Sequence, residues 1–390
     1  MLSAIRCKHV FNLTGIVVLL CAVPLISIAA LDWTVEVTEA AAIALSGLTA
    51  AEFDGVAVTS NISSTLIYFA DSQSGWDAVN RWDGTNLTLF ATEEQLDPHN
   101  VAPNTPNASF YDMTCDKSGV LYLLIGGTGY QEVLWRVPGD DFSNAVLMMA
   151  IPDINEAAEI AVDETNSRLV VAYNDFYGVP GPSFGEGIGY VPLNATNASV
   201  TQLASEAELQ AVINAIPGST SGDIDPYDVT VQSDGTVLVS HGFNSNAEET
   251  GSIIKVSAGG GASLFASAAT LITAAGADPA VVNIGSVHLH TLSDDRILAH
   301  VAFSSNNTTL EPFIAAGSPD GSTWQVLATQ SQILADPDMA AFTSIGDLDG
   351  KHGNVDGNDD YWWHQQTPNG IVKMTGISAS SSVDNWALYQ

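Results

Sequence analysis

Residues 227–231 read Tyr227-Asp228-Val229-Thr230-Val231, and the turn Ser233-Asp234-Gly235 with a second apolar run follows them. Short runs of β-branched residues that are bounded by turn residues predict β-strands. The same opening, with a polar residue in second place, recurs near residues 53, 111, 158, 287 and 342, at spacings of 47 to 69 residues. Such a recurrence indicates a repeat architecture.

Each repeat continues with a turn and further short strand patterns, for instance Val120 to Ile125 and then Val133 to Val137 in the second copy. Four short antiparallel strands per repeat are typical of a propeller blade. We therefore predict an all-β fold, a six-bladed β-propeller of four-stranded antiparallel blades that forms one domain over residues 31–390. The last blade has two candidate outer strands, at 32–37 and at 385–389.

The opening strands, such as Gly55-Val56-Ala57-Val58, and the strand–turn–strand unit at 227–239 resemble the NHL and regucalcin/gluconolactonase-like six-bladed propellers, the TolB-like superfamily. The resemblance spans the chain from residue 31 and implies the fold. It implies activity much less directly, because propellers carry many functions.

The first 29 residues predict a secretory signal peptide. Arg6 and Lys8 precede an apolar run from Ile16 to Ile28, and small residues follow. The run is too short for a membrane span, so we expect a secreted protein, extracellular or periplasmic, without a membrane anchor in its mature form. The mature chain then keeps one cysteine, Cys115, and has no intrachain disulfide.

The chain is strongly acidic. It carries 44 Asp and Glu against 10 Lys and Arg, which gives a formal net charge of −34. Nucleic acid is therefore disfavoured as a partner. We expect a monomer that binds a small molecule or a protein on the face where its long loops gather, since loops on a rigid scaffold commonly form binding sites.

The repeated second position places acidic residues at one register of the inner strands, namely Asp54, Asp112, Glu159 and Asp228. Inner strands line the channel of a propeller, so these groups should converge near its axis. Protonation, hydrogen bonds to backbone N–H groups or a hard cation such as Ca²⁺ would each relieve their repulsion. We predict a cation or small-ligand site at the loop-rich end of the channel; polar residues that only join neighbouring strands are the alternative.

The family resemblance bears on this site. In that family a central metal is held by a glutamate, two asparagines and an aspartate; Asp54 and Asp228 lie where such acidic ligands could stand, and Asn174 is an amide candidate. Asp112 and Glu159 stand where the family has uncharged amides, and the first blade has no Glu-Gly-Pro opening. The sequence therefore leaves open whether the chain is an enzyme.

Two further patterns carry candidate chemistry. His288 and His290 alternate on one strand and share one face. They could ligate a metal or act as general bases in a Ca²⁺-dependent lactonase or esterase. Asp347, Asp349, Asp356 and Asp359 form an Asp- and Gly-rich segment that predicts a structural calcium loop, although Asp349-Gly350 also aligns with the hairpin turn Asp234-Gly235.

Overall fold

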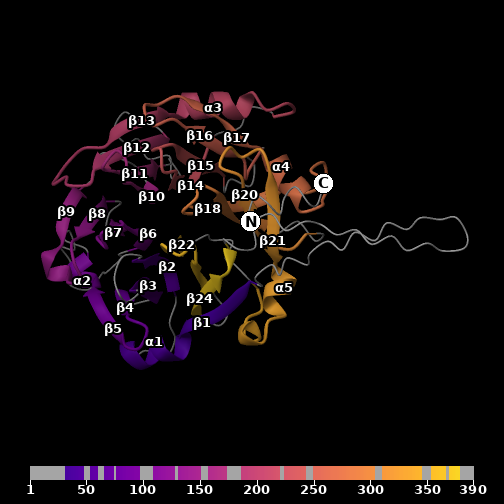
Figure 1. The fold of residues 1–390 in the computed structure, drawn as a ribbon. Helices are drawn as coiled ribbons and strands as arrows, with labels where there is room; N and C mark the ends of the chain where they lie inside the picture. The colour runs from indigo at the N-terminus through magenta and orange to yellow at the C-terminus, as the bar shows by residue number, and fades with distance from the viewer. Residues whose placement is uncertain are drawn as a thin grey trace, which may run out of the picture.

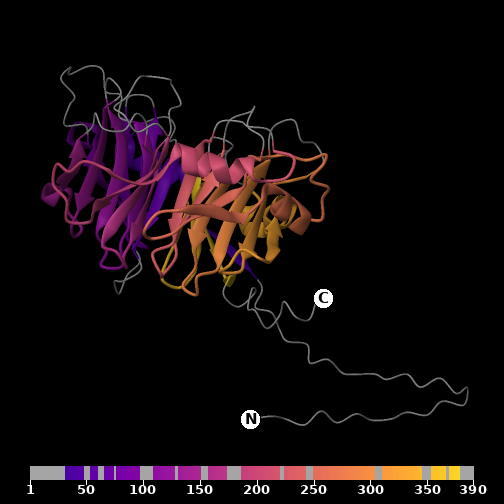
Figure 2. The ribbon, with the colours of Figure 1, turned by 90° about the horizontal axis from the view of Figure 1, so that it is seen from above.

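The computed structural model describes residues 31–47, 53–59, 66–73, 76–96, 109–127, 131–150, 157–173, 186–219, 224–242, 249–303, 310–344, 353–365 and 369–377. Their strands form six four-stranded antiparallel sheets arranged in a ring, which Figure 1 shows along the axis and Figure 2 from the side. The predicted six-bladed β-propeller is confirmed.

The first three blades are simple meanders in which the first strand lies innermost and the fourth outermost. Their strands are β2 (Phe53–Val58), β3 (Ile67–Gln73), β4 (Trp76–Trp82) and β5 (Leu87–Thr92); β6 (Ser109–Cys115), β7 (Leu121–Gly127), β8 (Gln131–Val137) and β9 (Val146–Ala150); and β10 (Ala157–Asp163), β11 (Arg168–Tyr173), β12 (Gly187–Pro192) and β13 (Thr201–Ser205).

The fourth and fifth blades repeat this order. Their strands are β14 (Pro226–Val231), β15 (Val237–His241), β16 (Ile253–Val256) and β17 (Ala262–Ala266), followed by β18 (Ile284–Thr291), β19 (Ile297–Phe303), β20 (Phe313–Gly317) and β21 (Trp324–Thr329). Inner strands of neighbouring blades pack side by side around the axis, so their register decides what faces the channel.

Short helices lead from outer strands toward the next blade. They are α1 (Glu39–Ser46), α2 (Glu93–Leu96), α3 (Glu206–Asn214), α4 (Ala268–Ala274), α5 (Gln330–Leu334) and the 3₁₀ turn η2 (Pro337–Met339). A second 3₁₀ turn, η1 (Phe142–Asn144), joins β8 to β9 within the second blade. Four of the helices begin at a Ser or Thr whose hydroxyl accepts a hydrogen bond from a backbone N–H of the first turn: Thr38, Ser205, Ser267 and Thr329. Among the described residues no helix is long and apolar enough to cross a membrane.

The sixth blade is built from both ends of the described chain. Its strands from the channel outward are β22 (Asn354–Val355), β23 (Tyr361–Gln365), β24 (Gly370–Thr375) and β1 (Asp32–Thr38). In this register Trp33 pairs with Met374, and Trp33 and Val37 are buried. The N-terminal strand thus closes the ring, and residues 385–389 lie outside the described part.

The structure corrects the position of the last inner strand. Phe342 to Ser344 follow η2 and are not in a strand, whereas the innermost strand of the sixth sheet is β22, twelve residues later than Phe342. Phe342 is instead buried against the core of this blade. Phe342, an apolar residue before a polar pair, matches the repeat pattern in composition. In the structure its role is different, because it packs under the helical connector.

Apolar side chains from adjacent blades interleave between the sheets. One cluster joins Leu238 and Ile253 of the fourth blade to Val287, Leu289 and Ala299 of the fifth, all buried. Because burial of such side chains stabilises a fold by about 1.5 to 3 kcal/mol each, every blade depends on its neighbours. The packing holds the inner strands rigidly about the axis.

Hairpin turns between the first and second strands lie together at one end, which we call the hairpin-turn face. Two of these turns have Gly119 and Gly235 with positive φ (83° and 82°), and two have Asp295 and Asp359 in the same left-handed region (65° and 61°). Each aspartate reaches the turn of the preceding blade. Asp295 accepts hydrogen bonds from the backbone N–H and Oγ of Ser233 at 2.7 and 2.5 Å, and Asp359 does so from Ser293 at 2.6 and 2.8 Å.

Candidate functional site

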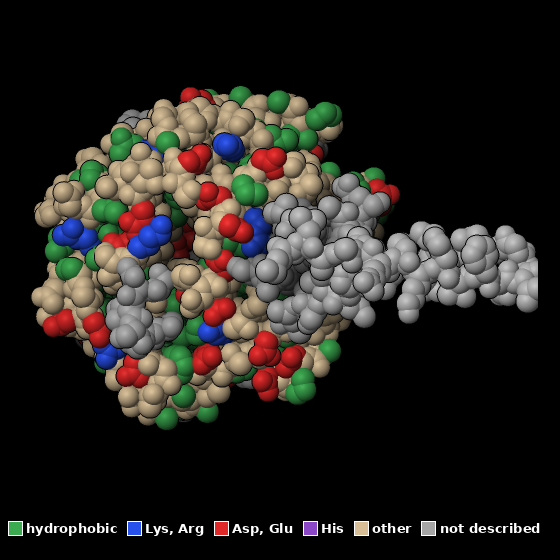
Figure 3. All heavy atoms as spheres, in the orientation of Figure 1, with side chains coloured by type: hydrophobic (Ala, Val, Ile, Leu, Met, Phe, Trp, Pro, Cys, Tyr) green, Lys and Arg blue, Asp and Glu red, His purple; other side chains and the backbone are tan. Residues whose placement is uncertain are grey.

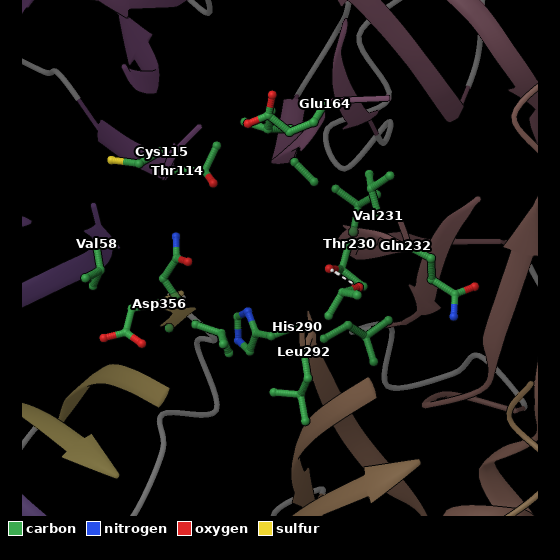
Figure 4. Close-up of a pocket in the computed structure, with 18 of the residues that line it drawn as sticks. Val58, Thr114, Cys115, Glu164, Thr230, Val231, Gln232, His290, Leu292 and Asp356 are labelled. Carbon is green, nitrogen blue, oxygen red and sulfur yellow. Dashed lines mark hydrogen bonds between the residues drawn. The ribbon is translucent and has the colours of Figure 1, made fainter. Parts of the chain in front are cut away.

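A cavity of about 550 Å³ lies on the propeller axis, and residues from all six inner strands line it from its inner end to the hairpin-turn face. In Figure 3 carboxylates surround the hollow at the centre of this face. The close-up in Figure 4 shows Thr114, Thr230 and His290 directed toward the opening. We call this cavity the channel.

The inner end of the channel carries Asp112, Glu159 and Asp228, the channel head; all three are buried at their predicted register. Asp54 belongs to β2, but its side chain lies outside the described part, as does Asn174. The structure therefore brings together three of the five residues predicted for a cation site. The loop-rich end where the site was expected includes segments 97–108, 174–185 and 243–248, which are also outside it.

Asp112 joins two blades. Its Oδ1 accepts a hydrogen bond from the N–H of Met113 at 2.6 Å, and its Oδ2 accepts one from the N–H of Ile160 in the next blade at 2.8 Å. Burial raises the pKa of Asp112 to about 8, and these hydrogen bonds oppose the rise. The neighbouring side chain of Glu159 also opposes the rise.

Asp228 repeats the arrangement two blades further on. Its Oδ1 accepts from the N–H of Val229 at 2.6 Å, and its Oδ2 accepts from the N–H of Leu289 in the fifth blade at 2.7 Å. The same Oδ2 lies 3.3 Å from Nδ1 of His288. The register of acidic residues thus works as a set of bonds between inner strands, and Asp228 also orients an imidazole.

The two predicted histidines have different surroundings. His288 is buried and contacts the rings of Tyr227 and His300, whose centroids lie 5.2 and 6.5 Å away. His290 lines the channel and lies against Tyr361 at 5.0 Å. Burial lowers the pKa of His290 to about 4, against the attraction of Asp228, so this imidazole is neutral at pH 7.

His300 completes an aromatic cluster between the fifth and sixth blades. It is the cross-strand partner of His288, and its Nδ1 lies 3.2 Å from the hydroxyl of Tyr361. Burial, together with the neighbouring imidazoles, lowers the pKa of His300 to about 3. Sequence reasoning missed the contribution of Tyr361, because it comes from another blade 61 residues away and no local pattern links the two positions.

The predicted calcium loop is divided by the structure. Asp347 and Asp349 lie outside the described residues. Asp356 begins the β22–β23 turn: its Oδ1 accepts from the N–H groups of Asn358 and Asp360, and its Oδ2 from the indole of Trp362. The turn that aligns with Ser233-Asp234-Gly235 is therefore 356–359, and the alignment of Asp349-Gly350 with that turn is wrong.

The described side chains include no group of three or more His, Cys, Asp or Glu placed to hold a metal ion. Two of the three head carboxylates, Asp112 and Asp228, already accept backbone hydrogen bonds. What the channel offers instead is a polar wall for hydrogen bonding. Thr230 and Thr291 share a hydrogen bond of 3.0 Å in its middle, between the channel head and the hairpin-turn face.

Comparison with known proteins adds to this description of the fold. Neither a protein-family model nor a curated protein matches the chain. Among solved structures, a protein of unknown function from Bacteroides thetaiotaomicron is similar over 89% of this chain and 76% of its own, with 13% identity and a TM-score of 0.52. At that identity the likeness shows the fold alone.

Two other matches are a gluconolactonase from Xanthomonas campestris and a TolB-type protein from Agrobacterium tumefaciens. The first is 13% identical, covers 70% of this chain and 92% of its own, and has a TM-score of 0.36. The second is 10% identical, covers 71% and 81%, and has a TM-score of 0.44. The six four-stranded sheets of the chain itself confirm the six-bladed propeller that the sequence resemblance implied; at these TM-scores the two matches add no further argument.

Proposed function

We propose that this chain is a binding module whose small polar ligand occupies the channel. The observation that carries the proposal is the axial cavity of about 550 Å³, which falls within the range of about 300 to 1,000 Å³ that is usual for small-molecule sites. Its wall combines carboxylates, threonine hydroxyls and the neutral imidazole of His290. Such groups fix a polar ligand by hydrogen bonds and exclude a purely apolar one.

The roles of the head carboxylates favour binding over metal-centred catalysis. Asp112 and Asp228 each accept a backbone hydrogen bond from the following inner strand, so they hold blades in place. If the same carboxylate oxygens also held a metal ion, they would have to bond to the ion and to the backbone at once. A rigid channel whose wall is fixed in this way is preorganised for a ligand, which lowers the entropic cost of binding.

The test is a thermal-shift screen of neutral sugars, lactones, amino acids and amines on the purified protein, with Thr114→Trp as the blocking variant. Thr114 points into the channel, so the indole would fill it. Thr201→Trp, on the exposed face of outer strand β13, is the matched control. We expect a hit whose stabilisation disappears in Thr114→Trp and persists in Thr201→Trp. Equal stabilisation of both variants would place binding elsewhere and reject the proposal.

A second candidate function is a Ca²⁺-dependent lactonase or esterase. The observation in its favour is the 3.3 Å contact between Asp228 Oδ2 and His288 Nδ1, which would orient the imidazole as a general base. In this candidate Ca²⁺ bound near the channel head would polarise the substrate carbonyl. Turnover of a lactone and aryl-ester panel with added Ca²⁺, lost in His288→Gln but kept in the exposed variant Gln210→Glu, would support it; no turnover above background rejects it.

The proposal includes export and a monomeric state. Cleavage after the predicted signal segment would leave the chain starting just before β1, the strand that closes the ring. N-terminal sequencing of protein recovered from the medium of a secreting host should find a start at about residue 30, and light scattering should give one chain per particle. An intact N-terminus on the exported protein would contradict the first expectation, and a dimer the second.

A further inference from the structure

The channel has carboxylates at two separate levels. The inner level is the channel head, and the outer level, which we call the rim, consists of Glu164, Asp295 and Asp359 at the hairpin-turn face. Glu159 and Glu164 belong to the same stretch of chain, five residues apart. At the strand rise of about 3.3 Å per residue, the two levels are separated by roughly 16 Å.

An uncharged polar belt lies between these levels. Thr114, Thr230, Thr291 and His290 contribute to it. The Nε2 atom of His290 is buried in the channel wall and has no hydrogen-bond partner among the described residues. In the tautomer that carries its proton on Nδ1, this atom is an acceptor that lacks a donor. A buried acceptor without a donor lowers the stability of the fold unless a bound group donates a hydrogen bond to it. The belt therefore favours a ligand that donates hydrogen bonds.

The charge of the lining selects among possible donors. The rim carboxylates accept hydrogen bonds from neutral groups: Glu164 accepts from the backbone N–H of Lys117 at 2.6 Å, and Asp295 and Asp359 accept from serines. Lys117 is the only Lys or Arg among the described lining residues. An anionic ligand would therefore be repelled at both levels, and a ligand with positive charge at each end would be attracted.

We propose that the channel binds a linear polyamine, with one terminal ammonium group at the head, the other at the rim and an internal amine donating to the belt. This inference rests on the proposed channel site and names its ligand class. An extended tetra-amine matches the separation of the two levels, whereas a short diamine reaches one level only. Inorganic cations lack the length to engage both.

The experiment is isothermal titration calorimetry of the mature protein with spermine, putrescine, butylamine and calcium chloride at matched ionic strength. Glu164→Gln is the test variant, because glutamine keeps the acceptor for the Lys117 N–H and removes the charge. Asp320→Asn is the control variant; it removes the same charge from the exposed β20–β21 turn, outside the channel lining.

We expect one spermine per chain, bound at least tenfold more tightly than putrescine or butylamine. Glu164→Gln should weaken spermine roughly fivefold, the effect of losing one partly exposed ion pair, and leave butylamine unchanged. If Asp320→Asn weakens spermine binding as much as Glu164→Gln does, or if Ca²⁺ binds as tightly as spermine, the binding would reflect general charge attraction. Either result would overturn the inference. If spermine fails while a neutral compound binds and is blocked by Thr114→Trp, only the polyamine assignment is wrong; if neither binds, the channel function falls as well.

Discussion

The contact between the turns of the fifth and sixth blades gives a prediction that depends on one side chain. Asp359 is buried, holds a left-handed backbone conformation (φ 61°) and accepts hydrogen bonds from both the N–H and the Oγ of Ser293. We consider two replacements, Asp359→Gly and Asp359→Ala. Both remove the carboxylate, but only glycine relieves the backbone strain.

The magnitudes follow from the geometry. Two hydrogen bonds to a buried carboxylate contribute about 1.5 kcal/mol each, so losing both costs about 3 kcal/mol. Glycine recovers about 1 kcal/mol because it has no Cβ in the left-handed region, which Gly119 and Gly235 occupy in the equivalent turns. We therefore expect a loss of about 2 kcal/mol for Asp359→Gly, and a loss about 1 kcal/mol larger for Asp359→Ala.

Urea denaturation of the mature protein, extrapolated to water, measures these changes. Ser293→Ala, alone and combined with Asp359→Gly, completes a double-mutant cycle. The cycle should show that the two substitutions together cost less than the sum of the single ones, because they remove shared hydrogen bonds. If Asp359→Gly is as stable as the parent protein, the turn contact contributes nothing and the reasoning is refuted.

Three further outcomes test other parts of the fold. Removal of β1 (Asp32–Thr38) should cost at least about 4 kcal/mol, from buried side chains alone, and expose the β24 edge; a monomeric, cooperatively unfolding truncated chain would contradict closure by this strand. The free energy of unfolding should rise between about pH 3 and 6.5, because in this range the His300 imidazole is protonated in the unfolded chain and neutral in the folded one. His300→Phe should flatten that rise, and an unchanged pH profile in this variant would contradict the expectation. Arg168→Met leaves Asp163 charged and buried and should cost about 3 to 5 kcal/mol by urea denaturation. Arg296→Met, whose partner Asp294 is half exposed, should cost clearly less, and equal losses would contradict the burial argument.

The sequence carried the architecture because each inner strand has its own local signal. Tyr227 to Val231 alternates polar and apolar residues and ends at a glycine turn, and such patterns follow from strand geometry wherever they occur. The sixth blade lacks that signal: β22 has only two residues, and its turn uses Asp359 where the second and fourth blades have glycine. The repeat pattern therefore falls on Phe342, which matches in composition but packs under a connector.

The sequence predicts where the acidic residues of the candidate site lie along their strands, but not what their side chains bond to. Alternation along the strands placed Asp112, Glu159 and Asp228 together, as the structure has them. The bonds from Asp112 and Asp228 to the next inner strand depend on the spacing between blades, which no local pattern encodes. The contact of Asp228 with His288, 60 residues away, has the same origin.

The most direct test of the account is a crystal structure of the mature protein with the tightest-binding compound from the screen, or with spermine. We expect ligand density along the axis between Asp228 and the rim carboxylates, within hydrogen-bonding distance of His290. Density only on the outer surface, with the channel filled by solvent at full ligand occupancy, would contradict the claim that the channel is the binding site.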